Sequence, residues 1–127
     1  MSNILHIKQI HDAHSEWNSV IEFTRAEITS FETRLQEIAK ANTGKDLLAQ
    51  AEHFQNQFIL QKEVMDKLQH EIHEDENRIA ENVKENAVAV EHRKLPENTS
   101  LSEKMLMFQK TYAELKTHYM QFMARIL

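Results

Sequence analysis

The sequence predicts an all-α fold in which residues 1–127 form one domain, an antiparallel bundle of three helices packed like a coiled coil. The 127 residues include one glycine and one proline, too few for the many tight turns of a β fold. Apolar residues recur at alternating steps of three and four along three long segments, as in a coiled-coil seam. The strong breaks in this pattern lie at Asn42–Asp46 and Lys94–Ser100.

The first predicted helix covers residues 3–41. Its repeating positions, most of them apolar, are Ile7, Ile10, His14, Trp17, Ile21, Thr24, Ile28, Phe31, Leu35 and Ile38. Gly44 follows this helix and predicts a C-terminal cap in the left-handed conformation. Thr43 and Asp46, three residues apart, predict the N-terminal cap of the next helix.

The second predicted helix covers residues 45–93. Its repeating positions are Ala51, Phe54, Phe58, Gln61, Met65, Leu68, Ile72, Asp75 and Ile79. The pattern weakens after Ile79, so the sequence leaves open whether the helix is continuous through Asn82–Asn86.

The third predicted helix covers residues 100–127, after the break at Pro96. Ser100 and Glu103 form the S-x-x-E pattern of a capping box at its start. Its repeating positions are all apolar or aromatic: Leu101, Met105, Phe108, Tyr112, Leu115, Tyr119, Phe122 and Ile126. This third helix is the shortest of the three.

Tight turns at both breaks would place each helix antiparallel to the one before it. The short third helix would then cover only the second half of the second helix and about the first twenty residues of the first. Residues 20–67 would protrude as a long hairpin with an exposed apolar stripe, and such a stripe usually marks an interaction surface. The predicted interface residues are Val20, Phe23, Ile28, Phe31, Leu35, Phe54, Phe58 and Ile59.

A second copy of the chain is the simplest cover for this hairpin, so the sequence predicts a homodimer, with another helical protein as the alternative partner. If the third helix shifts, or if the second helix breaks near Asn82–Asn86, the result is instead a compact monomer. Further apolar residues lie outside the seam, where Met in particular suits contact with a partner helix: Leu60, Val64, Met107 and Met120.

Two polar layers interrupt the predicted seam between the first two helices. The antiparallel alignment places His14 opposite Asp75, and Thr24 opposite Gln61. A paired polar layer lowers stability but excludes wrong alignments of an apolar seam. We therefore expect these pairs to fix the register of the hairpin.

The eight histidines raise an alternative function, a helical-bundle metal site. Imidazole and carboxylate groups together suit transition metals such as zinc, iron or manganese. The candidate ligands, which the predicted alignment places at one level of the bundle, are His11, His14, His73, Asp75 and His118. A transition metal bound here would be the only cofactor that the sequence suggests.

Composition and missing motifs limit the other functions. The net charge of −5 disfavours binding to nucleic acid or to an anionic membrane, and no apolar run approaches the length of about 18 residues that spans a bilayer. The chain has no cysteine, no glycine-rich phosphate loop and no Ser/His/Asp arrangement. The sequence therefore predicts a non-enzymatic interaction or scaffold protein. Because no signal peptide is visible in its first residues, we expect the chain in the cytoplasm.

Overall fold

The computed structural model describes the backbone of residues 2–85 and 99–126 and the side chains of residues 6–84 and 100–126. These residues form three α-helices and no strand: α1 (Ser2–Ala41), α2 (Lys45–Glu85) and α4 (Thr99–Ile126). The predicted all-α helical bundle is confirmed. α2 is continuous through Asn82, whereas residues 86–93 of the predicted second helix lie outside the described residues.

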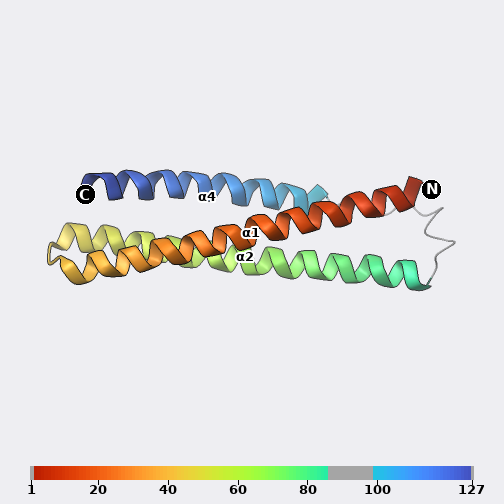
Figure 1. Ribbon diagram of the computed structural model, residues 1–127, viewed down its shortest axis with the longest axis horizontal. Coiled ribbons are helices and arrows are strands. Elements are labelled where there is room, and N and C mark those ends of the chain that lie inside the picture. The colour runs from red at the N-terminus through yellow and green to blue at the C-terminus, as the bar shows by residue number, and fades with distance from the viewer. Residues whose placement is uncertain (1, 86–98, 127) are drawn as a thin grey trace.

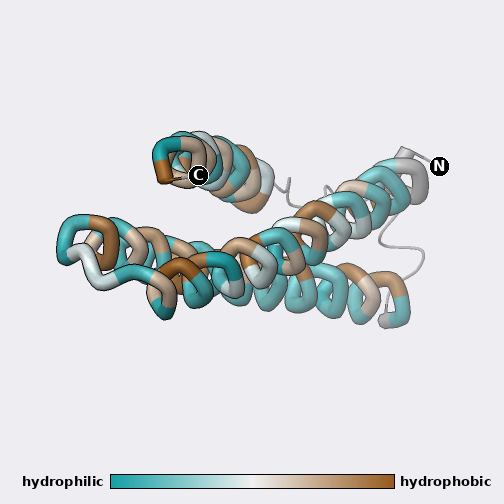
Figure 2. The backbone as a smooth tube through the Cα atoms, turned by 60° about the vertical axis from the view of Figure 1, so that its left-hand side comes forward, coloured by the Kyte–Doolittle hydropathy of each residue, from teal (hydrophilic) through white to brown (hydrophobic). Residues whose placement is uncertain are grey.

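α1 and α2 form a long antiparallel hairpin, and α4 lies along one side of it (Figure 1). α4 runs in the same direction as α1, so its C-terminal end lies beside the turn that joins α1 to α2 (Figure 1). Figure 2 shows the same arrangement from another side, with α4 as a separate rod over the hairpin. None of the described helices is both long enough and apolar enough to cross a membrane.

The turn between α1 and α2 is capped differently from the prediction. Gly44 does not adopt a positive φ, so the predicted left-handed cap is wrong. The Asn42 side-chain amide instead donates a hydrogen bond to the carbonyl oxygen of Ile38 at 2.8 Å, satisfying one of the last carbonyl groups of α1. The Gly44 carbonyl accepts from the Leu48 amide at 3.0 Å, and Gly44 is therefore the N-cap residue of α2, which begins at Lys45, rather than the C-terminal cap of α1.

One continuous core runs along all three helices, and its centre is aromatic. The ring of Tyr119 in α4 lies 4.4 Å from that of Phe31 and 5.5 Å from that of Phe58, measured between centroids. The Phe122 ring lies 5.2 Å from that of Phe54. Since ring pairs at these distances stabilise a core beyond the effect of their buried area, this layer fixes α4 on the hairpin.

The predicted position of α4 is wrong. The predicted alignment places Tyr119 opposite Asp75 and Phe122 opposite Ile72, but these rings contact Phe58 and Phe54. α4 is therefore displaced by about five helical turns, roughly 27 Å, towards the turn of the hairpin. The hairpin is not bare there, and five of the predicted interface residues are buried in the monomer core: Ile28, Phe31, Leu35, Phe54 and Phe58.

The displacement has a physical reason in the side chains that face each other. In the predicted position Tyr119 would lie opposite the Asp75 carboxylate, whereas in the structure it joins three phenylalanine rings. Full burial of one large apolar side chain stabilises a fold by about 1.5–3 kcal/mol, so pairing the aromatic segments outweighs pairing the nearest segments in sequence. The predicted tight turn near Pro96 lies outside the described residues.

Candidate functional site

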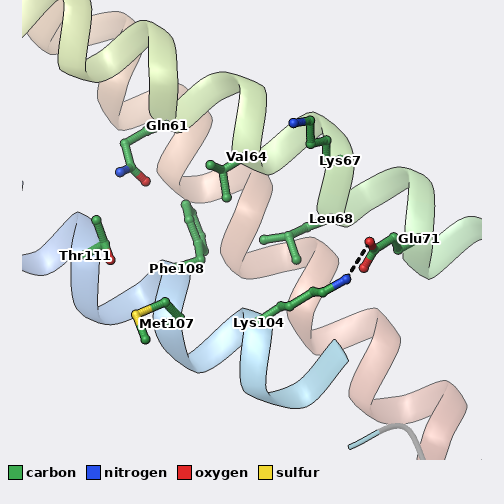
Figure 3. Close-up of a pocket in the computed structure, with 9 residues that line it drawn as sticks. All are labelled: Gln61, Val64, Lys67, Leu68, Glu71, Lys104, Met107, Phe108 and Thr111. Atoms are coloured by element: carbon green, nitrogen blue, oxygen red, sulfur yellow. Dashed lines mark hydrogen bonds and ion pairs between the residues drawn. The ribbon is translucent and has the colours of Figure 1, made fainter. Parts of the chain in front are cut away.

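The strongest candidate for a binding site is an open groove of about 320 Å³ between α2 and α4 (Figure 3). We call it the α2–α4 groove. Its lining residues are Gln61, Val64, Lys67, Leu68, Glu71, Lys104, Met107, Phe108 and Thr111. A volume of about 300 Å³ is the lower limit for sites that bind small molecules, so the groove has room for one compact group.

The groove has a buried apolar floor and exposed apolar rims. Leu68 and Phe108 are buried core residues at its floor. Val64 on α2 and Met107 on α4 line it from opposite sides (Figure 3), and Met107 is 63% exposed. Leu60, one turn before Val64 on α2, is also exposed and extends the apolar surface. Large side chains of this kind, exposed beside a hollow, are typical of a surface that contacts another molecule.

The two ends of the groove are polar in different ways. At one end the Lys104 ammonium donates to the Glu71 carboxylate at 2.8 Å (Figure 3). At the other end lie Thr111 and Gln61. Gln61 is only 6% exposed, and its Oε1 atom is buried without a hydrogen-bond partner. A buried carbonyl oxygen without a partner destabilises a fold, so it calls for an explanation.

The other predicted interface residues do not share one surface. Val20 is partly buried and packs against the core. Phe23, at 69% exposure, is the most exposed large apolar residue of the described chain. Ile59 is exposed but lines a different hollow, between α1 and α2, together with Glu32 and Leu48. The predicted stripe therefore divides into a buried core and separate exposed residues.

Sequence reasoning did not find the α2–α4 groove, although it noted some of its residues. Val64 and Met107 stand outside the seam, which was the available signal. Their meeting at one groove depends on the alignment of α4 with α2, and that alignment follows from aromatic packing that the predicted alignment did not include.

His14 lies at the centre of a polar cluster between α1 and α2. It is 1% exposed, and its Nε2 atom lies 3.3 Å from Asp75 Oδ2. Its Nδ1 atom lies 2.7 Å from Glu76 Oε1, where the carboxylate accepts the hydrogen bond. His11 Nδ1 lies 3.1 Å from the same Glu76 oxygen, and Arg78 forms an ion pair with Asp75. The structure thus brings His14 and Asp75 together and adds Glu76, a stronger partner.

The partners of Glu76 change its acidity. Burial alone would raise the pKa of the Glu76 carboxyl, but the hydrogen bonds from His14 and His11 outweigh burial and hold this pKa below its ordinary value. Glu76 is therefore ionised at neutral pH and supplies the negative charge that the imidazoles face.

The second predicted polar pair is not formed. Thr24 and Gln61 are both buried, but the Thr24 hydroxyl donates to the carbonyl oxygen of Val20 at 2.8 Å, one turn earlier in α1. Threonine in a helix often bonds its own backbone in this way. The Gln61 carbonyl consequently gains no donor from Thr24.

A different polar contact joins α1 to α4. The Tyr112 hydroxyl donates to Glu27 Oε1 at 2.6 Å, and the Lys116 ammonium donates to Glu27 Oε2 at 3.0 Å. Burial opposes ionisation of Glu27, but these two hydrogen bonds prevail and lower the pKa of its carboxyl. Burial and the bond to Glu27 raise the pKa of Tyr112. The sequence alignment missed this contact because it placed Tyr112 elsewhere.

The predicted metal-ligand set is not assembled. His73 is exposed and contacts Asn77 at 3.2 Å, and His118 lines a separate hollow with His53, near the turn of the hairpin. The displacement of α4 carries His118 away from the level of His14. Among residues 6–84 and 100–126, no group of three or more metal-binding side chains is arranged to hold an ion.

Comparison of the chain with models of protein families, with curated protein sequences and with solved structures finds no match. The geometry of the bundle is therefore the basis for a functional proposal.

Proposed function

We propose that this chain is a non-enzymatic interaction protein and that it binds a helical segment of a partner at the α2–α4 groove. The observation that carries the proposal is the exposure of Val64 and Met107 in one apolar groove, with exposed Leu60 one turn before Val64 on α2. Partner helices commonly place their apolar face in a groove between two helices, with anchors spaced by three or four residues. Methionine is well suited to such a surface because its side chain adapts to different partners.

The groove favours a partner helix over a second copy of the chain. The case for a homodimer depended on a bare hairpin, but α4 covers that part of the hairpin and buries its apolar stripe. The apolar surface that remains around the groove is small, and standard stable interfaces bury about 800 Å² on each side. We therefore expect a chain that is monomeric by itself at low micromolar concentration and associates with another helical protein.

Light scattering tests the first part of this proposal. The expected mass at low micromolar concentration is 15.0 kDa, that of one chain. A mass of about 30 kDa would show self-association instead. In that case the variant Val64→Lys, Met107→Lys would decide whether the groove is the self-interface, since introduced charges there would restore the monomer.

Co-purification with matched variants tests the second part. The tagged wild-type chain is compared with Val64→Lys, Met107→Lys and with the control Phe23→Lys, which places a charge on a different exposed apolar residue. We expect a defined protein to accompany the wild type and the control at equal stoichiometry and to be lost from the groove variant. Equal retention by all three chains, or by none, would contradict binding at the groove.

Circular dichroism shows whether the groove variant remains folded. Val64 and Met107 are both exposed, so their replacement should change the free energy of unfolding by less than about 0.5 kcal/mol. Loss of the partner with unchanged stability would then report on binding alone.

A further inference from the structure

The buried Oε1 atom of Gln61 indicates which chemical groups would bind favourably in the α2–α4 groove. Gln61 lines the groove, is 6% exposed and has no hydrogen-bond partner for Oε1. A buried carbonyl oxygen that loses its bond to water and gains none in return destabilises the folded chain. A donor from a bound group would remove this penalty, so the groove is poised to accept a hydrogen bond.

No described side chain donates to Gln61 Oε1 in the structure. The Lys104 ammonium is bound to Glu71 at the opposite end of the groove, and the Thr24 hydroxyl, on α1, is bound to the Val20 carbonyl. The terminal torsion of the Gln61 side chain is soft, so rotation about χ3 can bring Oε1 to face a donor in the groove.

The apolar lining of the groove favours a flat, apolar ring in the bound group. Phe108 and Leu68 form its floor, and Val64 and Met107 form its sides (Figure 3). Aromatic rings and the thioether of methionine both pack favourably against a flat ring. A volume of about 320 Å³ admits one ring system rather than a whole helix. The groove therefore combines a slot for one ring with a single hydrogen-bond acceptor.

A second copy of this chain does not provide an exposed indole or phenol ring. The sequence contains one tryptophan and two tyrosines. Trp17 packs partly buried against the core, and Tyr112 and Tyr119 are buried in it. The exposed aromatic residue Phe23 has no donor. An exposed indole or phenol ring must therefore come from another molecule.

We propose that the α2–α4 groove receives one indole or phenol ring, supplied by the partner helix, and that Gln61 Oε1 accepts a hydrogen bond from the N–H or O–H of that ring. This inference depends on the proposed function and specifies the anchor of the partner. Aromatic residues with a polar atom are the commonest anchors of protein interfaces, because they bury a large area and still form a directed bond.

Titration with two small probes tests this anchor. Indole has the ring and the N–H donor, whereas 1-methylindole keeps the ring and lacks the donor. The chemical shifts of the ¹³C-labelled methyl groups of Met107, in the groove, and Met120, outside it, report where each probe binds. We expect both probes to shift Met107 and not Met120. Indole should bind about threefold to tenfold more tightly, the effect of one hydrogen bond.

Two variants separate the hydrogen bond from the extra bulk of the methyl group. Gln61→Leu removes the acceptor, and we expect the preference for indole to disappear. Gln57→Leu makes the same change one turn earlier in α2, at a residue outside the α2–α4 groove, and should keep the preference. Because Gln61→Leu removes an unpaired buried oxygen, the variant should fold at least as stably as the wild type.

The outcomes distinguish this inference from the proposed function. Equal affinities of the two probes for the wild type, or an unchanged preference in Gln61→Leu, would overturn the hydrogen-bonded anchor while leaving the partner groove intact. Failure of both probes to shift Met107 would overturn the aromatic anchor altogether. The co-purification experiment with Val64→Lys, Met107→Lys tests the partner groove independently of either result.

Discussion

The two halves of the hairpin are held together by different chemistry. Near the turn, α1 and α2 meet α4 through the rings of Phe31, Phe54, Phe58, Tyr119 and Phe122. Towards the other end, α1 and α2 meet through the imidazoles of His11 and His14 and the carboxylates of Asp75 and Glu76. The contrast shows that α4 packs on the part of the hairpin where its aromatic rings contact other rings, and not on the part that is nearest to it in the sequence.

The largest expected effect is in the aromatic half. Phe58 is fully buried between Phe31 and Tyr119, so Phe58→Ala should lower the free energy of unfolding by about 3–5 kcal/mol. The control Phe23→Ala, at an exposed phenylalanine of α1, should change it by less than about 0.5 kcal/mol. Urea unfolding followed by circular dichroism measures both. Similar losses in the two variants would contradict the position of α4.

The polar half should contribute less. In His14→Ala the two carboxylates lose their buried partner, and we expect a loss of about 1–3 kcal/mol. Trp17, whose ring centroid lies 5.5 Å from that of His14, is the only tryptophan and reports unfolding of this region by fluorescence. His70→Ala, at an exposed histidine of α2, is the control and should leave the midpoint unchanged. If His14→Ala lowered the free energy of unfolding as much as Phe58→Ala does, the two halves would not differ in their contribution to stability.

Acid should weaken both halves through one carboxyl in each. The pKa values of Glu76 and Glu27 lie below the ordinary value of 4.5, so the unfolded chain binds protons more readily than the folded chain. Their contribution to stability is complete well above pH 4.5 and declines as the pH falls through the lowered values. We expect Glu76→Gln and Glu27→Gln to be less stable than the wild type at pH 7 and to lose less on acidification. Urea midpoints at pH 7 and pH 3 measure this, and an unchanged pH dependence in both variants would contradict the assigned partners.

The smallest expected effects come from two unpaired oxygens in the core. Gln61 Oε1 and Tyr119 Oη are both buried without a hydrogen-bond partner. Replacing such a group by an apolar one of similar shape is neutral or stabilising, so Gln61→Leu and Tyr119→Phe should raise the stability by up to about 1 kcal/mol. Thermal melting checks this. A clear loss in Tyr119→Phe would indicate that its hydroxyl is bound.

The sequence predicted the helices well because their signals are local. The spacing of apolar residues in each segment, together with the breaks near Gly44 and Pro96, gave α1 and α4 nearly to the residue. The antiparallel turn also predicted that His14 would meet Asp75, because a short connection leaves little choice of alignment.

The position of α4 could not be predicted in the same way. Its alignment depends on which aromatic residues meet, as Phe54 and Phe122 do, and the seam pattern is identical at every heptad. Glu76 was likewise missed as the closest partner of His14 because a heptad pattern specifies the level of a residue but not the direction of a long side chain. Predicting the groove beside Met107 would require both the alignment of α4 and the directions of its long side chains.

The direction of α4 also determines the distance between the start of α1 and the end of α4. Because α4 runs parallel to α1, Ser2 and Ile126 lie at opposite ends of the rod (Figure 1). The 40 residues of α1 give a helix about 60 Å long. Two domains attached at these positions would be kept at nearly that separation by a stiff spacer, a molecular ruler whose length is set by the number of turns in one helix.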